Sequence, residues 1–173
     1  MSQSGADDGG GVDPQVVRRA VEQFERPLLA YALRIVGDVD RARDVVQETF
    51  AKLLRQSPAD ANGHLPQWLY TVCRNAALDA RRKEKRAMPM LETTVAETVK
   101  SDQPTPSESA ETRDATSHVL KLLSRLSDDQ QEAIRLKFQH GMSYRQISQI
   151  TGHSESNVGF LIHSGIKAIR SMM

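Results

Sequence analysis

The chain contains one cysteine, Cys73, among its 173 residues. A single thiol cannot build a disulfide framework or a cysteine-rich zinc site. The sequence also lacks any apolar run approaching the roughly 18 residues of a membrane-spanning helix. Its first residues are rich in Gly, Ser and Asp, so they do not resemble the apolar segment of a signal peptide. These absences predict a protein of the cytoplasm.

Catalytic and cofactor-binding motifs are also missing. The histidines at 64, 118, 140, 153 and 163 show no HExxH-like pairing, and no Gly-rich phosphate loop occurs. Cys73 lies on an apolar helical stripe, a position more typical of a core residue than of a nucleophile. The sequence therefore predicts a protein that is not an enzyme and that needs no cofactor or metal. An enzyme using Cys73 or a histidine is the weaker alternative.

Net charge is close to zero, at +1, but the charge is unevenly distributed. Residues 12–86 carry +4, residues 87–115 carry −4, and residues 116–173 carry +3. The acidic block mixes Pro, Thr, Ser and Glu, with too little apolar content to offset the entropy lost on ordering. We therefore expect a flexible tail over 1–13, a domain over 14–86, an acidic linker over 87–115 and a second domain over 116–173.

Apolar spacing in the first block predicts three helices. The first begins at Pro14 and ends at Gly37, and Asp38 or Asp40 caps the second. A loop rich in turn residues precedes the third helix, which starts near Pro66. The expected apolar stripes are Val17, Val21, Phe24, Leu28, Ala32 and Ile35; Ala42, Val45, Val46, Phe50, Leu53 and Leu54; and Leu69, Val72, Cys73, Ala76, Ala77 and Ala80.

The last block carries four helical signals. The first lies around Val119–Leu126, and two capping-box patterns, Ser127 with Gln130 and Ser143 with Gln146, begin the next two helices. Those helices are expected to end at Gly141 and Gly152, and Ser154 to cap the fourth. No convincing strand pattern is present. The predicted fold class is all-α, with two small helical domains joined by a flexible linker.

The short helix, Gly-containing turn and longer helix at the end of the chain fit a helix-turn-helix. Ile147 and Ile150 would face Val158 and Ile162 across the turn. The longer helix would then present its first residues to base edges in the major groove. An ordinary helical hairpin inside a bundle would show the same spacing.

The longer helix carries no Lys or Arg before Lys167. It therefore lacks the arginine-to-guanine contact that is commonest in specific readout. Asn157 would suit adenine, and Phe160 would suit a thymine methyl group or a protein surface. Phosphate contacts would fall to Arg145, Lys167 and Arg170.

Two further patches lie in the first domain. The third helix carries Trp68 near its start and ends in a basic run, a combination that suits a strand with stacked or flipped bases. A solvated terminus favoured by the helix dipole would carry the same charges. The second helix carries an acidic, amide-bearing patch opposite its apolar stripe, formed by Asp44, Gln47 and Glu48. Residues that are merely exposed to solvent would show the same placement.

Together these segments resemble the extracytoplasmic-function (ECF) branch of bacterial RNA polymerase sigma factors. Asp44–Phe50 is similar to the D-x-x-Q-E-x-F stretch of region 2. Residues 68–82 are similar to W-L-x-x-x-x-R-N-x-x-x-D-x-x-R, and Leu126–Arg170 resembles region 4, including Gly141–Ile147. The resemblance covers about four-fifths of the chain, in the family's order.

The resemblance implies a protein that recruits core RNA polymerase to promoters. It implies that region 2 binds the β′ clamp coiled coil, that region 4 meets the β flap, and that an anti-sigma factor is a further candidate partner. The loop Ser57–Leu65 would hold a flipped base, and the acidic linker would thread the polymerase channel. The implied sites are Asp44, Gln47, Glu48 and Phe50 for polymerase; Trp68, Arg74, Asn75, Asp79, Arg81 and Arg82 for the minus-ten element; and Arg145, Ser156, Asn157, Phe160, His163 and Lys167 for the minus-thirty-five element.

Two departures from the family pattern stand out. The recognition helix often reads T-V-K-S-R in the family, whereas Asn157–Leu161 lacks the basic pair. Arg43 stands where the family usually carries an acid. The alternative hypothesis is therefore a sigma-like regulator that acts through protein contacts, with little DNA reading by its C-terminal domain.

Overall fold

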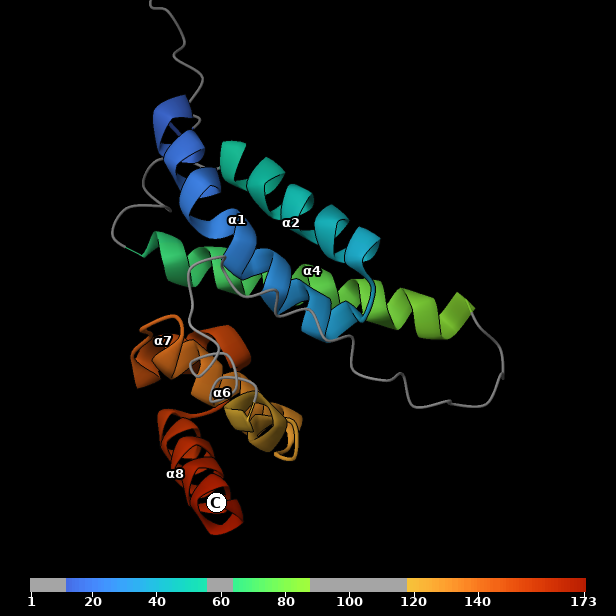
Figure 1. The fold of residues 1–173 in the computed structure, drawn as a ribbon. Coiled ribbons are helices and arrows are strands. Elements are labelled where there is room, and N and C mark those ends of the chain that lie inside the picture. The colour runs from blue at the N-terminus through green and yellow to red at the C-terminus, as the bar shows by residue number, and fades with distance from the viewer. Residues whose placement is uncertain (1–11, 56–63, 88–117) are drawn as a thin grey trace, which may run out of the picture. The chain divides into compact units, whose positions relative to one another are not determined.

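The structure, a computed structural model, describes residues 12–55, 64–87 and 118–173. The chain folds as two compact units, Met1–Val99 and Lys100–Met173. All regular secondary structure in the described ranges is helical (Figure 1), which confirms the predicted all-α class. The expected tail, the loop Ser57–Leu65 and the acidic linker lie almost wholly outside the described residues.

The first unit begins with helices whose ends were predicted from capping residues. In α1 (Pro14–Val36), the Asp13 carboxylate accepts a hydrogen bond from the backbone N–H of Gln15 at 2.8 Å. Gly37 ends α1 with φ of 73°, a left-handed conformation that glycine adopts without steric cost. Asp38, rather than Asp40, caps α2 (Val39–Leu54), since its Oδ1 accepts from Arg41 N at 2.9 Å.

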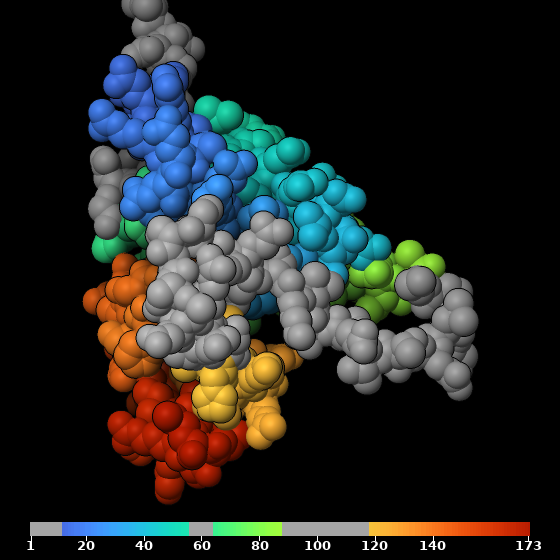
Figure 2. Space-filling view, viewed as in Figure 1, coloured from blue at the N-terminus to red at the C-terminus, as the bar shows by residue number. Residues whose placement is uncertain are grey.

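Helix α4 (Leu65–Ala87) completes a three-helix core. Leu28, Leu53 and Leu69, one from each helix, are fully buried. The rings of Tyr31 and Tyr70 meet edge to face, with centroids 5.2 Å apart, a favoured aromatic geometry. In the space-filling view, α1 and α2 present adjoining surfaces (Figure 2).

One member of the expected α2 stripe is misplaced. Leu54 is 52 % exposed, because it follows the fully buried Leu53 and points about 100° further around the helix. Thr49 occupies the buried face instead, and its hydroxyl donates to the carbonyl of Val45 at 2.8 Å. Internal bonding of this kind lets a polar residue sit in the core.

The second unit consists of a short helix over 118–123, α6 (Asp128–Phe138), α7 (Tyr144–Thr151) and α8 (Glu155–Met172). Both capping boxes form as predicted. Helix α6 ends at Phe138 rather than at the expected Gly141. Gly141 instead takes a φ of 65° in the turn that leads into α7.

The predicted contact of α7 with α8 is confirmed by burial, and α8 also packs on α6. Ile147, Ile150, Val158 and Ile162 are each at most 3 % exposed. At Gly165 an added Cβ would lie 2.7 Å from the Ile134 side chain, so glycine allows the close approach of α8 to α6. Gln130 Nε2 also donates to Ser164 Oγ at 3.0 Å across the same two helices.

Candidate polymerase and nucleic-acid interfaces

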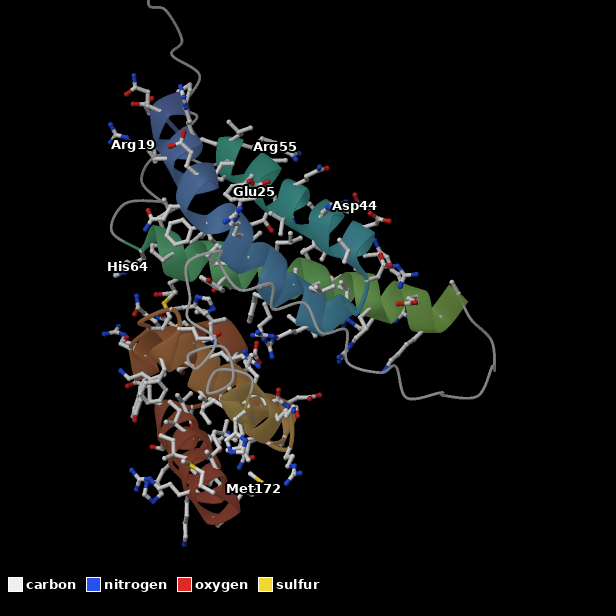
Figure 3. All side chains as sticks on the ribbon, viewed as in Figure 1. Arg19, Glu25, Asp44, Arg55, His64 and Met172 are labelled. Atoms are coloured by element: carbon white, nitrogen blue, oxygen red, sulfur yellow. The ribbon has the colours of Figure 1, made fainter. Side chains whose placement is uncertain are left out.

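The candidate polymerase-binding residues of α2 form an exposed polar face. Asp44, Gln47 and Glu48 are all exposed, and Asp44 points away from α2 in Figure 3. Glu48 pairs with Lys52 one turn further on, at 2.9 Å. Phe50 does not belong to this face, because it is only 8 % exposed and packs with the core side of α2. Its direct contact with a partner is therefore not supported, and it holds α2 in place.

The candidate minus-ten residues of α4 occupy two neighbouring stripes. Trp68, Asn75, Asp79 and Arg82 follow one another at spacings of seven, four and three, which places them along one helix face. Arg74 and Arg81 run beside them, seven residues apart. Trp68 and Arg74 are half-buried, whereas the other four residues are exposed. The Arg82 guanidinium contacts the Asp79 carboxylate at 2.5 Å.

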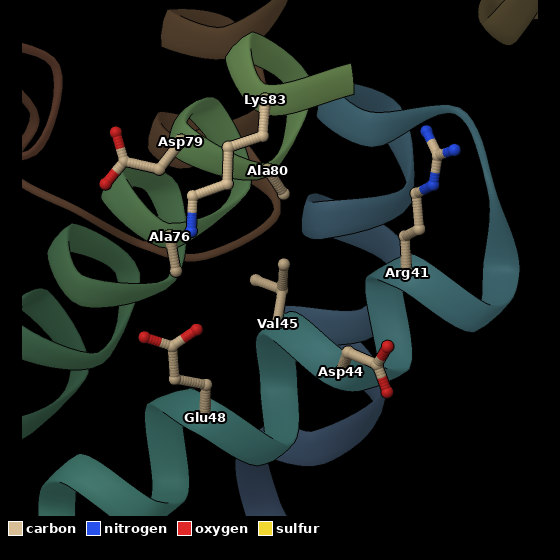
Figure 4. A pocket seen from close by; sticks show the side chains of 8 residues that line it. All are labelled: Arg41, Asp44, Val45, Glu48, Ala76, Asp79, Ala80 and Lys83. Atoms are coloured by element: carbon tan, nitrogen blue, oxygen red, sulfur yellow. The ribbon is translucent and has the colours of Figure 1, made fainter. Parts of the chain in front are cut away.

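A groove lies between the two candidate sites. It is lined by residues of α2 and α4, with Glu48 and Lys83 both pointing into it (Figure 4). An ion pair between Arg41 of α2 and Glu84 of α4 joins the helices. Hydrogen bonding to Glu84 raises the pKa of Arg41, so the guanidinium stays charged. The lining residues are Arg41, Asp44, Val45, Glu48, Ala76, Asp79, Ala80 and Lys83.

Sequence reasoning missed one charged residue of this groove, Arg41, whereas Lys83 belongs to the basic run expected at the end of the third helix. Helical spacing could have placed Arg41 on the same face as Asp44 and Glu48. Its pairing with Glu84 brings together residues 43 positions apart in the sequence. That contact depends on how α2 packs against α4, and no local pattern encodes it.

The candidate upstream-DNA residues of the second unit lie on α7 and α8 and are all exposed. Phe160 is 66 % exposed. Gly159, beside it, is half-buried, and a Cβ there would lie 3.5 Å from the ring of Tyr144, which is ordinary packing contact. As expected from the sequence, α8 holds no Lys or Arg before Lys167. The exposed set is Arg145, Ser156, Asn157, Phe160, His163 and Lys167.

His153, in the turn between α7 and α8, also belongs to this region, although the sequence did not single it out. Its Nδ1 lies 3.3 Å from Asn157 Nδ2, and its Nε2 lies 3.6 Å from Asp129 Oδ1 on α6. Its backbone carbonyl accepts from Ser148 Oγ at 2.6 Å, and its N–H donates to Thr151 Oγ1 at 3.3 Å. The backbone of His153 is therefore held by hydrogen bonds to α7, and its ring lies between Asp129 of α6 and Asn157 of α8.

The structure gives no support to nucleophilic chemistry at Cys73. The side chain is fully buried, and burial raises the pKa of the thiol to about 12, so the reactive thiolate does not form near neutral pH. Within residues 12–55, 64–87 and 118–173, no three His, Cys, Asp or Glu side chains are grouped to hold a metal ion.

Comparison with known proteins agrees with this arrangement. Residues 20–87 match sigma-70 region 2, and residues 118–169 match sigma-70 region 4. The ECF RNA polymerase sigma factor SigL of Mycobacterium tuberculosis is 30 % identical over 159 residues, covering 90 % of this chain and 87 % of SigL. The chain belongs to the ECF family of RNA polymerase sigma factors.

A second relative in the ECF family is EcfG of Rhodopseudomonas palustris. It is 35 % identical over 128 residues, covering 72 % of this chain and 67 % of EcfG. The fold is similar to that of the sigma factor RpoE in a co-crystal structure with the anti-sigma factor NepR from Bartonella quintana. That likeness has a TM-score of 0.64 and 23 % identity, and it covers 91 % of this chain and 96 % of RpoE.

Membership of this family settles the general function. An ECF sigma factor binds core RNA polymerase and directs it to promoters in transcription initiation. In the described part of the chain, none of the helices combines the length and apolar character needed to cross a membrane. The described residues that match region 2 and region 4 lie in separate compact units.

Proposed function

We propose that this ECF sigma factor divides its work among three exposed helix faces. The face of α2 binds the β′ clamp coiled coil of the polymerase, the face of α4 opens and reads the minus-ten element, and the face of α8 contacts the minus-thirty-five element. The observation that carries this proposal is that the candidate residues are exposed on their own helix or helix pair, apart from buried Phe50 and half-buried Trp68 and Arg74.

For α2, the chemistry favours a partner with basic and amide-binding groups. Asp44 has no ion pair among the described residues, and Gln47 is exposed beside it. A carboxylate and an amide on one face offer both acceptors and donors to a helical partner. These exposed groups are hydrated in the free protein, so a partner that covers them must replace their hydrogen bonds to water.

For α4, cations and an aromatic ring suit a separated DNA strand. Arg74, Arg81 and Arg82 supply positive charge along the helix, and Trp68 offers a ring at its start on which a base can stack. The exposed ion pair of Arg82 with Asp79 is weak in water, so a phosphate can replace the carboxylate. The loop Ser57–Leu65, proposed to hold a flipped base, lies almost wholly outside the described residues.

Other parts of the proposal follow from the family. The protein acts as a non-enzymatic specificity subunit in the cytoplasm, where RNA polymerase works. The second unit meets the β flap. The acidic linker over 87–115, which lies almost wholly outside the described residues, threads the polymerase channel. An anti-sigma factor is a further proposed partner, since the related RpoE was crystallised with NepR.

A second candidate function rests on Phe160. Its 66 % exposure and the lack of cations beside it on α8 would also suit a protein surface, and α8 would then contribute little DNA binding. Exposed aromatic residues of this kind are common at protein interfaces.

Site-specific photo-crosslinking in the reconstituted holoenzyme on promoter DNA tests both functions. A crosslinking residue replaces Gln47, Asn75 or Phe160, and exposed Arg19 on α1 serves as the control position. We expect position 47 to label β′, position 75 to label the DNA strand near minus ten, and position 160 to label upstream duplex. Labelling of protein alone from position 160 would favour the second function. Labelling of DNA from position 47 would contradict the assignment of α2.

A further inference from the structure

The turn of the helix-turn-helix contains a polar chain from α6 to α8. Asp129 Oδ1 lies 3.6 Å from His153 Nε2, and His153 Nδ1 lies 3.3 Å from the side-chain amide nitrogen of Asn157. His153 Nε2 is buried and has no hydrogen-bond partner within the described ranges, so the Asp129 carboxylate is the charged group that faces it.

The nearby carboxylate favours one of the two neutral tautomers of the His153 ring. A negative oxygen facing Nε2 favours the tautomer with hydrogen on Nε2, which leaves Nδ1 as an acceptor. Asn157 then donates one amide hydrogen to Nδ1. Its second amide hydrogen and its carbonyl oxygen remain for a ligand. The backbone N–H of Asn157 is held separately, by the Ser154 hydroxyl at 3.1 Å.

The free groups of Asn157 match one base in the major groove. Adenine presents an acceptor at N7 beside a donor at N6, and one amide can satisfy both. Phe160 lies three residues further along the same exposed face of α8. An apolar ring suits the methyl group of thymine. Guanine offers two acceptors, N7 and O6, so the carbonyl oxygen of Asn157 would face an acceptor instead of a donor.

We propose that the exposed face of α8 reads adenine·thymine pairs, with Asn157 directed to adenine by His153 and Phe160 facing a thymine methyl group. His153 is a positioning residue, which acts on DNA only through Asn157. The inference rests on the proposed contact of α8 with upstream promoter DNA and specifies its base preference. Holding the Asn157 amide in one orientation before binding should favour DNA binding, because the side chain then loses less conformational entropy when it meets the base.

The test is selection of promoter DNA by holoenzyme assembled from core polymerase and the full chain. The promoter keeps its downstream sequence fixed, and its upstream element is randomised. Wild type should enrich adenine or thymine at defined upstream positions. Asn157→Ala should lower the preference at one adenine by about five- to a hundredfold. His153→Ala should lower it at the same position, and His118→Ala, outside the turn, should leave it unchanged.

The outcomes separate the two proposals. If wild type enriches no upstream position, the proposed contact of α8 with DNA fails. If enrichment occurs but His153→Ala and Asn157→Ala leave base preference unaltered, or weaken all positions equally, the positioning role is wrong and the DNA contact stands. Thermal unfolding of each variant identifies loss of fold, and the exposed Asn157 provides a test even if His153→Ala is unstable.

The thymine contact has its own measurement. Replacing thymine by uracil at the enriched position removes only the methyl group. Wild-type holoenzyme should lose about two- to fivefold in affinity, the scale of one small apolar group, whereas Phe160→Ala should show no difference between the two bases. An equal effect of uracil on both proteins would overturn the assignment of Phe160.

Discussion

Replacing Arg82 by alanine should separate promoter opening from polymerase binding. The Arg82–Asp79 pair is exposed, at 67 % and 59 % for the two side chains, so its loss should cost the fold at most about 1 kcal/mol. A charge-assisted hydrogen bond from Arg82 to DNA is worth about 1.5–3 kcal/mol. We therefore expect Arg82→Ala to weaken promoter opening by about ten- to a hundredfold, with core affinity within about twofold of wild type.

The same substitution should change the response to salt. Removing one phosphate contact on a single strand lowers the slope of log affinity against log salt concentration by about 0.7. Opening is followed by a fluorescent base analogue near minus ten, and core affinity by fluorescence anisotropy. Arg18→Ala is the matched control, because Arg18 forms an equally local exposed pair with Glu22 on α1, at 3.1 Å.

Asp44→Ala should give the opposite result. Asp44 has no ion pair in the described structure and lies on α2, so its loss should reduce core affinity and leave opening by pre-assembled holoenzyme nearly unchanged. If Arg82→Ala and Asp44→Ala reduce both steps equally, the division of labour between α4 and α2 is wrong.

Three predictions concern the fold. Gly152→Ala should lower the free energy of unfolding by about 1 kcal/mol, because Gly152 has a φ of 81°. Gly159→Ala should raise it by about 0.5–1 kcal/mol, because Gly159 lies inside α8 and its added Cβ would meet only a 3.5 Å contact. Urea unfolding of both variants checks the opposite signs. Ser143→Ala removes the α7 cap and should cost about 1 kcal/mol by the same measurement. Burial raises the pKa of Cys73 to about 12. Between about pH 9 and 12 the thiol therefore ionises only in the unfolded chain, so the free energy of unfolding should fall as pH rises through this window. Cys73→Ala should remove this part of the pH dependence.

Much of the fold could be predicted from local signals. Helix caps form hydrogen bonds between residues no more than four positions apart, so sequence spacing reveals them. Examples are Gly37, Gly152 and both capping boxes. The apolar stripe also predicted the burial of Phe50. The exposure of Leu54 was less accessible, because an apolar residue near the edge of a stripe is placed by the neighbouring helices.

The candidate sites could be predicted only in part. Exposed residues on one helix face follow from periodicity, as at Asp44 and Gln47. Contacts between helices do not follow from periodicity. The pair of Arg41 with Glu84 forms only when α4 is in place, and the pair of His153 with Asp129 forms only when α6 is in place. The base preference proposed for α8 depends on the second of these pairs.

Transcription reconstituted from purified core polymerase, the full chain and genomic fragments tests the central claim most directly. The 5′ ends of the transcripts are mapped with and without the chain. The chain should produce new, discrete start sites that share sequence near minus ten, and Arg82→Ala should reduce their use while Arg18→Ala does not. Well-folded protein that binds core polymerase and yields no new start site from any fragment would contradict the claim that this chain directs initiation.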